Sequence, residues 1–349
     1  MSDTVLLTGA SGFIAKHLAL RLLEAGYRVR GTVRSRAKGE ETRLTLAAHG
    51  ADVARFEVVE VDLTRDKGWD RVADGCRFVQ HTASPFPSAP PRDKFGLVPV
   101  AKGGTLRVVA AAKRAGVERV VLTSSVVAVY HGHEGRREKR FSEADVSNVE
   151  SDTISSYAVS KTLAERAARE ALDGSATELA VCNPALVLGP GLDADAGTSL
   201  SIVAMMMKGL MPLVPKARFG IVDVRDVAEA HLRAMTVQQA AGRRLILSAG
   251  ERSLLQIGRA LAAAHPSLAR LPQATLPNAL VRFAGLFSSQ AALLRNELDP
   301  ERSLDASPAQ AILGLSFRSP EEAVEAAARS LVEHGLVRAP GGMERASRR

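Results

Sequence analysis

Short apolar runs alternate with longer segments of helical periodicity through the first two-thirds of the chain. The runs are brief and rich in β-branched residues, with apolar positions on both faces, as in strands buried on both sides of a parallel sheet. Between them, apolar residues recur at helical spacing, for example from Ile14 to Leu23 and from Val98 to Ala115. This repetition predicts an α/β fold with a doubly wound parallel sheet and helices on both faces. The predicted strands are Val5–Thr8, Arg28–Val33, Phe56–Val61, Phe78–Thr82, Val117–Thr123 and Thr177–Cys182.

The pattern changes after Pro184, where loops lengthen and helical segments dominate. We expect a Rossmann domain over residues 1–184 and a smaller, mostly helical substrate-binding lobe over 185–336. Residues 337–349 are expected to form a frayed basic tail. A strand near 244–248 and the segment 219–236 are expected to rejoin the first domain. The helices predicted for the lobe are Leu254–His265, Pro277–Leu294 and Pro320–His334.

The chain of 349 residues is basic, with 46 Lys and Arg against 38 Asp and Glu. Such a charge favours an anionic partner, but aromatic residues make up only 4% of the chain, too few for a surface on which bases stack. The largest basic block, residues 28–38, holds five basic side chains and no acidic one. The charge therefore points to one phosphorylated cofactor, and we expect no nucleic-acid partner.

Cysteine usage and hydropathy indicate the compartment. Cys76 and Cys182 lie far apart without a CxxC motif, which is typical of a reducing environment. The chain has no run of 18 apolar residues and no apparent signal peptide. His131 and His133 lack further ligands at metal-binding spacing. We expect a cytoplasmic protein without a membrane span or a metal site.

A glycine-rich loop lies where the first predicted strand meets the first helix, as Thr8-Gly9-Ala10-Ser11-Gly12-Phe13-Ile14-Ala15. Gly9 allows a tight turn, Gly12 allows close approach of a pyrophosphate, and the helix N-terminus attracts the anion. The alternative is a glycine-rich turn that binds nothing. The candidate cofactor contacts in this loop are Gly9, Ser11, Gly12, Phe13 and Ile14.

The end of the second strand favours NADP(H) over NAD(H). The segment from Gly31 to Lys38 contains no acidic residue to bind the ribose hydroxyls. Arg34 and Lys38 are able to pair with a 2′-phosphate instead, although a solvated basic loop is the alternative. By position, we expect Asp62 and Leu63 to flank the adenine. Thr82, Ala83 and Ser84 are expected to lie along the cofactor.

Tyr157 and Lys161 are four residues apart, which puts both side chains on one face of a helix. A lysine ammonium beside a phenol lowers the phenol's pKa, and such a tyrosine can protonate a carbonyl oxygen. The same lysine can hold a ribose hydroxyl of the cofactor. An amphipathic surface helix is the alternative. One of the pair Ser124-Ser125, after the fifth strand, would face the ligand crevice and donate a hydrogen bond to the substrate oxygen.

Seven motifs together resemble the extended short-chain dehydrogenases/reductases. Within that group, the chain is most similar to the branch of dihydroflavonol 4-reductase, cinnamoyl-CoA reductase and aldehyde reductase. The motifs are TGASGFIA (Thr8–Ala15), GYRVRGTVRS (Gly26–Ser35), HTASPF (His81–Phe86), LTSS (Leu122–Ser125), YAVSKTLAE (Tyr157–Glu165), NPALVLGP (Asn183–Pro190) and VDVRDVA (Val222–Ala228).

The resemblance implies a catalytic triad of Ser125, Tyr157 and Lys161. It also implies cofactor contacts from Pro184 and Val187 at the nicotinamide and from Ser199. The chain departs from the pattern at Ala101, where many extended members have asparagine, and at Val146, where tryptophan is common. No counterpart of the flavonoid-selecting asparagine stands in residues 128–132, so a flavonoid substrate is not expected.

We therefore predict an NADPH-dependent reductase of an aldehyde or ketone, acting on a small molecule as a monomer or homodimer. Candidate substrate contacts are Phe86, Tyr130 and Met206, although the run Met205-Met206-Met207 would equally suit helix packing. One alternative is a nucleotide-sugar epimerase or dehydratase with tightly bound NAD. Another is a non-catalytic dinucleotide-sensing protein.

Overall fold

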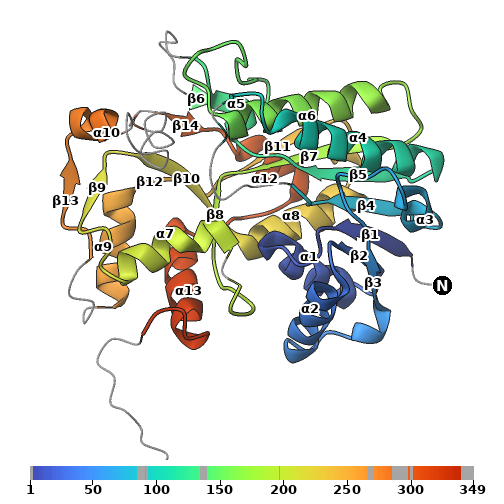
Figure 1. Cartoon of the computed structure of the whole chain (residues 1–349), viewed down its shortest axis with the longest axis horizontal. Helices are drawn as coiled ribbons and strands as arrows, with labels where there is room; N and C mark the ends of the chain where they lie inside the picture. Colours follow the sequence, from blue (N-terminus) through green and yellow to red (C-terminus); the bar gives the residue numbers. More distant parts are fainter. Residues whose placement is uncertain are drawn as a thin grey trace, which may run out of the picture.

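Seven parallel strands form the main sheet of the computed structural model, in the order β11-β7-β5-β4-β1-β2-β3 (Figure 1). The structure describes residues 3–84, 91, 93–133, 140–195, 197–265, 271–284, 298 and 302–338. This strand order is that of a doubly wound sheet, so the predicted fold class is confirmed. The strands are β1 (Thr4–Thr8), β2 (Arg28–Val33), β3 (Phe56–Glu60), β4 (Phe78–His81), β5 (Arg119–Thr123), β7 (Glu178–Pro184) and β11 (Arg244–Leu247).

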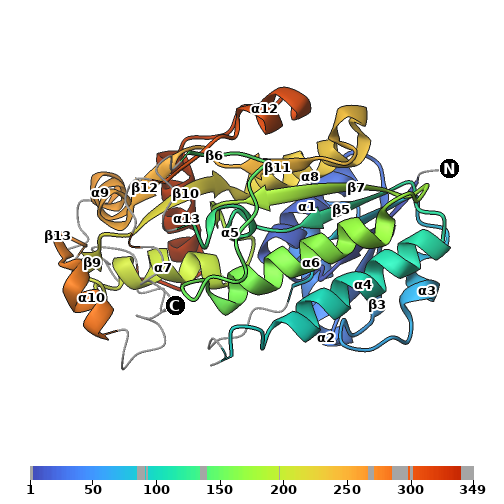
Figure 2. The same ribbon diagram turned by 90° about the horizontal axis from the view of Figure 1, so that it is seen from above.

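Helices cover both faces of this sheet (Figures 1 and 2). Alternate residues of β1 point to opposite faces. Leu6 packs with Val108 and Val109, while Val5 and Leu7 belong to the cluster of Leu18 and Leu22 on the other face. One layer contains α3 (Trp69–Ala73), α4 (Val98–Arg114) and α6 (Ser156–Leu172), and the other contains α1 (Phe13–Glu24), α2 (Arg36–Ala48) and α8 (Val224–Thr236).

A second lobe has a core of its own, which includes Leu188, Met206 and Ile257. Its three-stranded sheet has the order β12-β10-β8, and β9 pairs with β13. Its strands are β8 (Leu186–Leu188), β9 (Leu213–Pro215), β10 (Arg218–Asp223), β12 (Glu251–Ser253) and β13 (Ala274–Leu276). Its helices are α7 (Gly197–Met207), α9 (Leu254–Ala264), α10 (Asn278–Ala284) and α13 (Pro320–Glu333).

Segments from the second half of the chain return to the main sheet. β11 pairs with β7. The segment 219–236 divides between the two sheets, because β10 pairs with β8 and β12 whereas α8 packs on β5 and β7. The domain boundaries themselves stay a prediction. The remaining short elements are η1 (Val53–Arg55), α5 (Val127–Tyr130), β6 (Arg140–Phe141), η2 (Gln238–Ala240), β14 (Ser303–Leu304) and α12 (Ser307–Leu313).

The strand order reverses between β1 and β4, and the carboxyl ends of these strands are joined by side-chain hydrogen bonds. Thr82 Oγ1 donates to the Thr8 carbonyl at 2.6 Å, and the Ala83 amide donates to Thr8 Oγ1 at 3.1 Å. In doubly wound sheets the ligand crevice lies at this point. In the described part of the chain, no helix is long and apolar enough to cross a membrane.

Candidate active site

The glycine-rich loop turns sharply between β1 and α1. Gly9 has φ +66°, and a Cβ at this position would lie 3.0 Å from the Cα of Ala83. Gly12 is the N-cap of α1, whose start has neither a capping side chain nor an acidic residue in its first turn. The first N–H groups of a helix need a partner, so this start fits a pyrophosphate approaching over Gly9 and Gly12.

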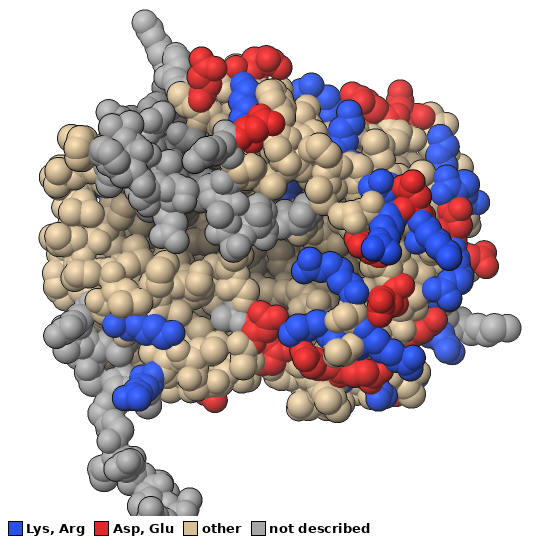
Figure 3. Space-filling model, in the orientation of Figure 1, with Lys and Arg blue, Asp and Glu red and all other residues tan. Residues whose placement is uncertain are grey.

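A cleft of about 420 Å³ opens beside this loop. Figure 3 shows a hollow on this face, between a half with many charged side chains and a half with few. Predicted site residues from six separate segments meet in the cleft. They are Ile14, Thr82, Ser84, Ser125, Tyr130, Tyr157, Lys161, Pro184, Val187 and Ser199.

The three predicted catalytic side chains come together at the end of β5. Ser155 caps α6 by accepting a hydrogen bond from the Ala158 amide, and this helix presents Tyr157 and Lys161 one turn apart. Ser125 lines the cleft beside Tyr157, and its hydroxyl accepts a hydrogen bond from the Val127 amide at 3.3 Å. Lys161 Nζ donates to the carbonyl of Thr123 at 2.9 Å. The structure therefore gathers two hydroxyls and one ammonium group on one wall of the cleft.

The neighbouring buried polar groups distinguish the two serines. Ser124 Oγ donates to Glu165 Oε2 at 2.7 Å, and Asn183 Nδ2 donates to the same oxygen at 3.0 Å. Asn183 also donates to the Ser125 carbonyl at 3.1 Å, and Arg244 Nε pairs with Glu165 at 2.6 Å. Ser124 is thus bonded to Glu165, whereas Ser125 is the serine whose hydroxyl helps to lower the pKa of Tyr157 against the effect of burial.

Burial shifts the pKa values of both ionisable members of this group. The pKa of Lys161 falls to about 8, because burial disfavours the ammonium more than the charge of Glu165 supports it. The pKa of Tyr157 rises to about 12, because burial outweighs the hydrogen bond from Ser125. The expectation of a lowered Tyr157 pKa is therefore wrong for this structure. The phenol is protonated at neutral pH, which is the form a general acid needs.

The other predicted cofactor residues lie outside the cleft. Arg34 is exposed just after β2, and its charge helps to lower the pKa of Asp62, to which hydrogen bonds from Thr64 contribute more. Lys38 is exposed and pairs with Glu41 at 2.7 Å. Their role toward a 2′-phosphate stays a prediction. Ser11 and Phe13 lie half-buried at the start of α1, Leu63 packs against Gly104, and Ala83 lies against Gly9.

One of the three predicted substrate contacts does not lie in the cleft. Tyr130 lines the cleft, with the guanidinium of Arg302 4.2 Å from its ring centre. Met206 does not line the cleft, because it is 0% exposed and packs in the core of the second lobe. The cleft reaches α7 only at its first turn, at Thr198 and Ser199. Phe86 lies outside the described residues.

Some residues of the cleft were not predicted from the sequence, notably Phe219 and Gly220 on β10. A Cβ at Gly220 would lie 2.8 Å from Ser248 Oγ and 2.9 Å from the Leu304 side chain, so glycine permits the close packing there. The sequence of β10, RFGIVD, shows no alternation of apolar and polar residues that would have marked these two positions. The other cleft residues not predicted are Thr123, Val126, Val127, Ala185, Leu186 and Thr198.

Comparison with known proteins agrees with this geometry. The model of the NAD dependent epimerase/dehydratase family matches residues 5–250. A cinnamoyl-CoA reductase of Medicago truncatula is 35% identical over 283 residues, covering 78% of this chain and 84% of that protein. The NADPH-dependent methylglyoxal reductase GRE2 of Saccharomyces cerevisiae is 35% identical over 268 residues, covering 70% and 78%.

The solved structures include the yeast methylglyoxal/isovaleraldehyde reductase Gre2 complexed with NADPH. It superposes with a TM-score of 0.78 at 29% identity, and the match covers 95% of this chain and 99% of that one. The family model covers the phosphate loop, Ser125, Tyr157 and Lys161 in one stretch. The chain belongs to the NAD dependent epimerase/dehydratase family, in its extended short-chain dehydrogenase/reductase branch.

Proposed function

We propose that the protein is an NADPH-dependent reductase that converts an aldehyde or ketone to its alcohol. The observation that carries this proposal is the meeting of Ser125, Tyr157 and Lys161 in one cleft. The NADPH-dependent methylglyoxal reductase and the cinnamoyl-CoA reductase among its relatives support it. The apolar cleft residues Val127, Leu186 and Phe219 favour a carbonyl compound with an apolar substituent.

The residues of the cleft fit the chemistry of carbonyl reduction. NADPH, when bound, supplies the hydride for the carbonyl carbon. Ser125 Oγ is suited to orient the carbonyl oxygen through a hydrogen bond. Tyr157, protonated at neutral pH, then transfers its proton to that oxygen as negative charge develops there. The ammonium of Lys161, oriented by the Thr123 carbonyl, stabilises the phenolate that remains.

The loop and the end of β2 would hold the cofactor. The uncapped start of α1 and the close approach allowed at Gly9 suit the pyrophosphate. Arg34 and Lys38 would bind the 2′-phosphate, since no acidic side chain stands between Gly31 and Lys38. Asp62 and Leu63 would flank the adenine, and Pro184, Val187 and Ser199 would line the path toward the nicotinamide.

The proposed activity is tested with the purified protein, NADPH and a panel of aldehydes and ketones, following the loss of NADPH absorbance. We expect oxidation of NADPH with at least one apolar aldehyde or ketone. A nucleotide-sugar epimerase would instead copurify with tightly bound NAD and turn over without net oxidation of added NADPH. That result, or no oxidation across the panel, would contradict the proposal.

Replacing both Arg34 and Lys38 by Ser should raise the KM for NADPH by about 30-fold or more, because each cation forms at least about 1 kcal/mol of charge-assisted contact with a phosphate. The KM for NADH should change by less than about threefold, since NADH has no 2′-phosphate. Arg43→Ser is a matched control, because Arg43 is an exposed cation on the same helix that pairs with Glu40. An equal rise of both KM values would remove Arg34 and Lys38 from the 2′-phosphate site.

The proposal extends to partner and compartment. A small carbonyl compound and its alcohol are the partners that the cleft suits. Cys76 and Cys182 are both buried and free, which supports the proposed cytoplasmic location. The absence of a nucleic-acid partner and the choice between monomer and homodimer stay predictions.

A further inference from the structure

The segment between β8 and α7 connects two elements that line the cleft. Leu186 and Val187 of β8 line the cleft before this segment, and Thr198 and Ser199 in the first turn of α7 line it afterwards. The placement of residues 189–195 therefore decides how α7 approaches the cofactor loop.

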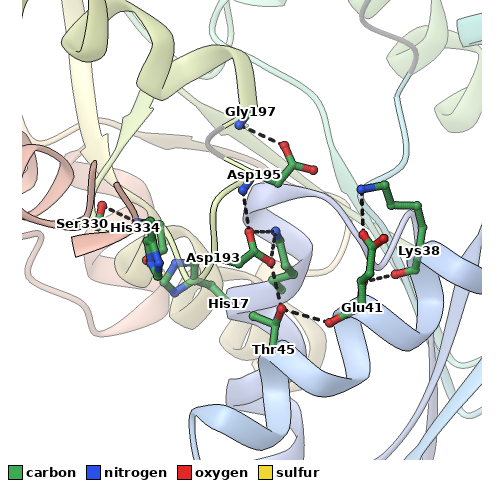
Figure 4. A network of polar contacts seen from close by, with 12 residues as sticks. His17, Lys38, Glu41, Thr45, Asp193, Asp195, Gly197, Ser330 and His334 are labelled. Atoms are coloured by element: carbon green, nitrogen blue, oxygen red, sulfur yellow. Dashed lines mark hydrogen bonds and ion pairs between the residues drawn. The ribbon is translucent and has the colours of Figure 1, made fainter. Parts of the chain in front are cut away.

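One ion pair joins this segment to α1, in the nucleotide-binding half of the protein. Lys16 Nζ of α1 contacts both carboxylate oxygens of Asp193, at 2.6 and 2.7 Å. Thr45 of α2 donates to Asp193 Oδ2 at 2.9 Å, and the amide of Asp195 donates to Asp193 Oδ1 at 3.0 Å (Figure 4). We name these three side chains, Lys16, Asp193 and Thr45, the clasp.

The clasp lies close to the phosphate loop. Lys16 lies one turn into α1, and its amide donates to the Gly12 carbonyl at 2.9 Å. A Cβ at Gly197, the first residue of α7, would lie 3.7 Å from the Cβ of Phe13. The starts of α1 and α7 are therefore in contact beside the cleft, on the side where the pyrophosphate would enter.

The first part of the segment is held differently. His17 Nε2 lies 2.8 Å from the Pro190 carbonyl, while the Gly191 amide donates to Ser330 Oγ at 2.8 Å. His334 Nε2 lies 3.1 Å from the Gly191 carbonyl (Figure 4). These contacts fix residues 190 and 191 to α1 and α13. Further along, Asp193 makes the described hydrogen bonds and ion pair that join residues 192–195 to α1 and α2, while Asp195 acts on Lys38 of α2 through its charge.

The burial of the clasp argues for a positional effect. The Lys16 side chain is only 4% exposed, and a buried ammonium without a partner is strongly unfavourable. The Asp193 side chain is 29% exposed, and such a partly buried ion pair adds little stability compared with a well-packed apolar pair. Because Lys16 makes two short contacts to the carboxylate of Asp193, the pair instead favours one position of residues 189–195.

We propose that Lys16 and Asp193 are positioning residues for the cofactor. By holding the segment against α1 and α2, they keep the first turn of α7 closed over the start of α1, so that NADPH leaves slowly. This inference rests on the proposed function and deepens it, since it concerns retention of the cofactor in the same cleft. It assigns neither residue a part in proton or hydride transfer.

The test measures NADPH dissociation by stopped-flow fluorescence, with no carbonyl compound present. Asp193→Asn and Lys16→Met should each release NADPH about tenfold faster or more, because loss of either partner shifts residues 189–195 toward positions from which NADPH can leave. With saturating NADPH, kcat should stay within about twofold of the wild type unless NADP release limits it, in which case kcat rises. A merely structural defect would instead lower kcat and the melting temperature without accelerating release.

Asp195→Asn is the matched control. It removes the same charge two residues along, while the asparagine oxygen can still accept the hydrogen bond from the Gly197 amide. It should leave the dissociation rate within about twofold of the wild type, since Asp195 does not touch Lys16. An equal acceleration in Asp195→Asn would show that charge, and not the clasp, sets retention and would overturn the inference.

Two further variants allow for poor folding of the single ones. Lys16→Met combined with Asp193→Asn leaves no buried charge unpaired and should accelerate release as much as either single change, not additively. Thr45→Val removes one hydrogen bond and should accelerate release about two- to fivefold. Wild-type release rates in the folded double variant would overturn the inference. A protein that binds NADPH but reduces no carbonyl would overturn the proposed function alone, whereas one that binds no NADPH would overturn both.

Discussion

Tyr157→Phe is expected to lower kcat for carbonyl reduction by about 10²–10⁴-fold, the usual contribution of a positioned general acid. Phenylalanine keeps the ring and its packing but removes the proton that the oxygen would receive. Because the pyrophosphate and the 2′-phosphate would be held by the loop at Gly9 and by Arg34 and Lys38, the Kd for NADPH should stay within about threefold. Steady-state kinetics and fluorescence titration measure the two quantities.

Tyr27→Phe provides the control for loss of a tyrosine hydroxyl elsewhere. Tyr27 lies outside the cleft, and its ring packs edge-on against Phe78, with the ring centres 6.5 Å apart. Its loss should leave kcat within about twofold of the wild type. If Tyr157→Phe turned over as the wild type does, Tyr157 would have no part in the chemistry.

Acidification from pH 7 to pH 5 is expected to lower the free energy of unfolding by about 4–6 kcal/mol. Burial lowers the pKa of His17 to about 4 and the pKa values of His81 and His231 to about 3, from 6.5. At pH 5 the unfolded chain protonates these histidines and the folded protein does not, a difference of about 2 kcal/mol each. The lower end of the range allows for Glu143 and Asp226, whose pKa values burial raises and which act in the opposite direction.

The direction of this pH dependence follows from the lowered pKa values of the three histidines. Above pH 6.5 the three histidines are neutral in both states, so their contribution to stability is complete. It is lost as the pH falls toward the folded-state values of about 4 and about 3. Urea unfolding at several pH values between 7 and 5 measures the slope.

His231→Gln isolates one of these histidines. His231 lies 2.9 Å from Gln80 Oε1 and 3.2 Å from Thr123 Oγ1, so glutamine replaces a polar group with another. Whatever its effect on absolute stability, it should reduce the pH dependence by about a third. A loss below about 1 kcal/mol in the wild type between pH 7 and 5 would contradict the buried neutral histidines.

The main sheet and the placement of Tyr157 and Lys161 on one helix were predictable, because their signals are local. A strand buried on both faces is apolar throughout, and the spacing of Tyr157 and Lys161 places both on one helix face. The residues alone left Ser124 and Ser125 open, and the family resemblance chose Ser125. The structure adds a physical reason, because the Ser124 hydroxyl is bonded to Glu165.

The features that were missed depend on distant partners. β10 pairs with β8 and β12, two short strands from other parts of the chain. The residues near β10 in the sequence therefore do not show that Phe219 and Gly220 line the cleft. The helix containing Met206 reads GTSLSIVAMMM, which is apolar on several faces, so its sequence does not tell the cleft side from the core side. Lys16 reads as an ordinary surface charge, and its burial depends on Asp193, 177 residues away.

The central claim, hydride transfer from NADPH to a carbonyl carbon, is tested most directly with NADPH deuterated at C4 of the nicotinamide. The alcohol formed from an accepted aldehyde or ketone is analysed by mass spectrometry. We predict one deuterium on the former carbonyl carbon for each NADPH consumed. An alcohol without deuterium, or oxidation of NADPH without an alcohol, would contradict the account.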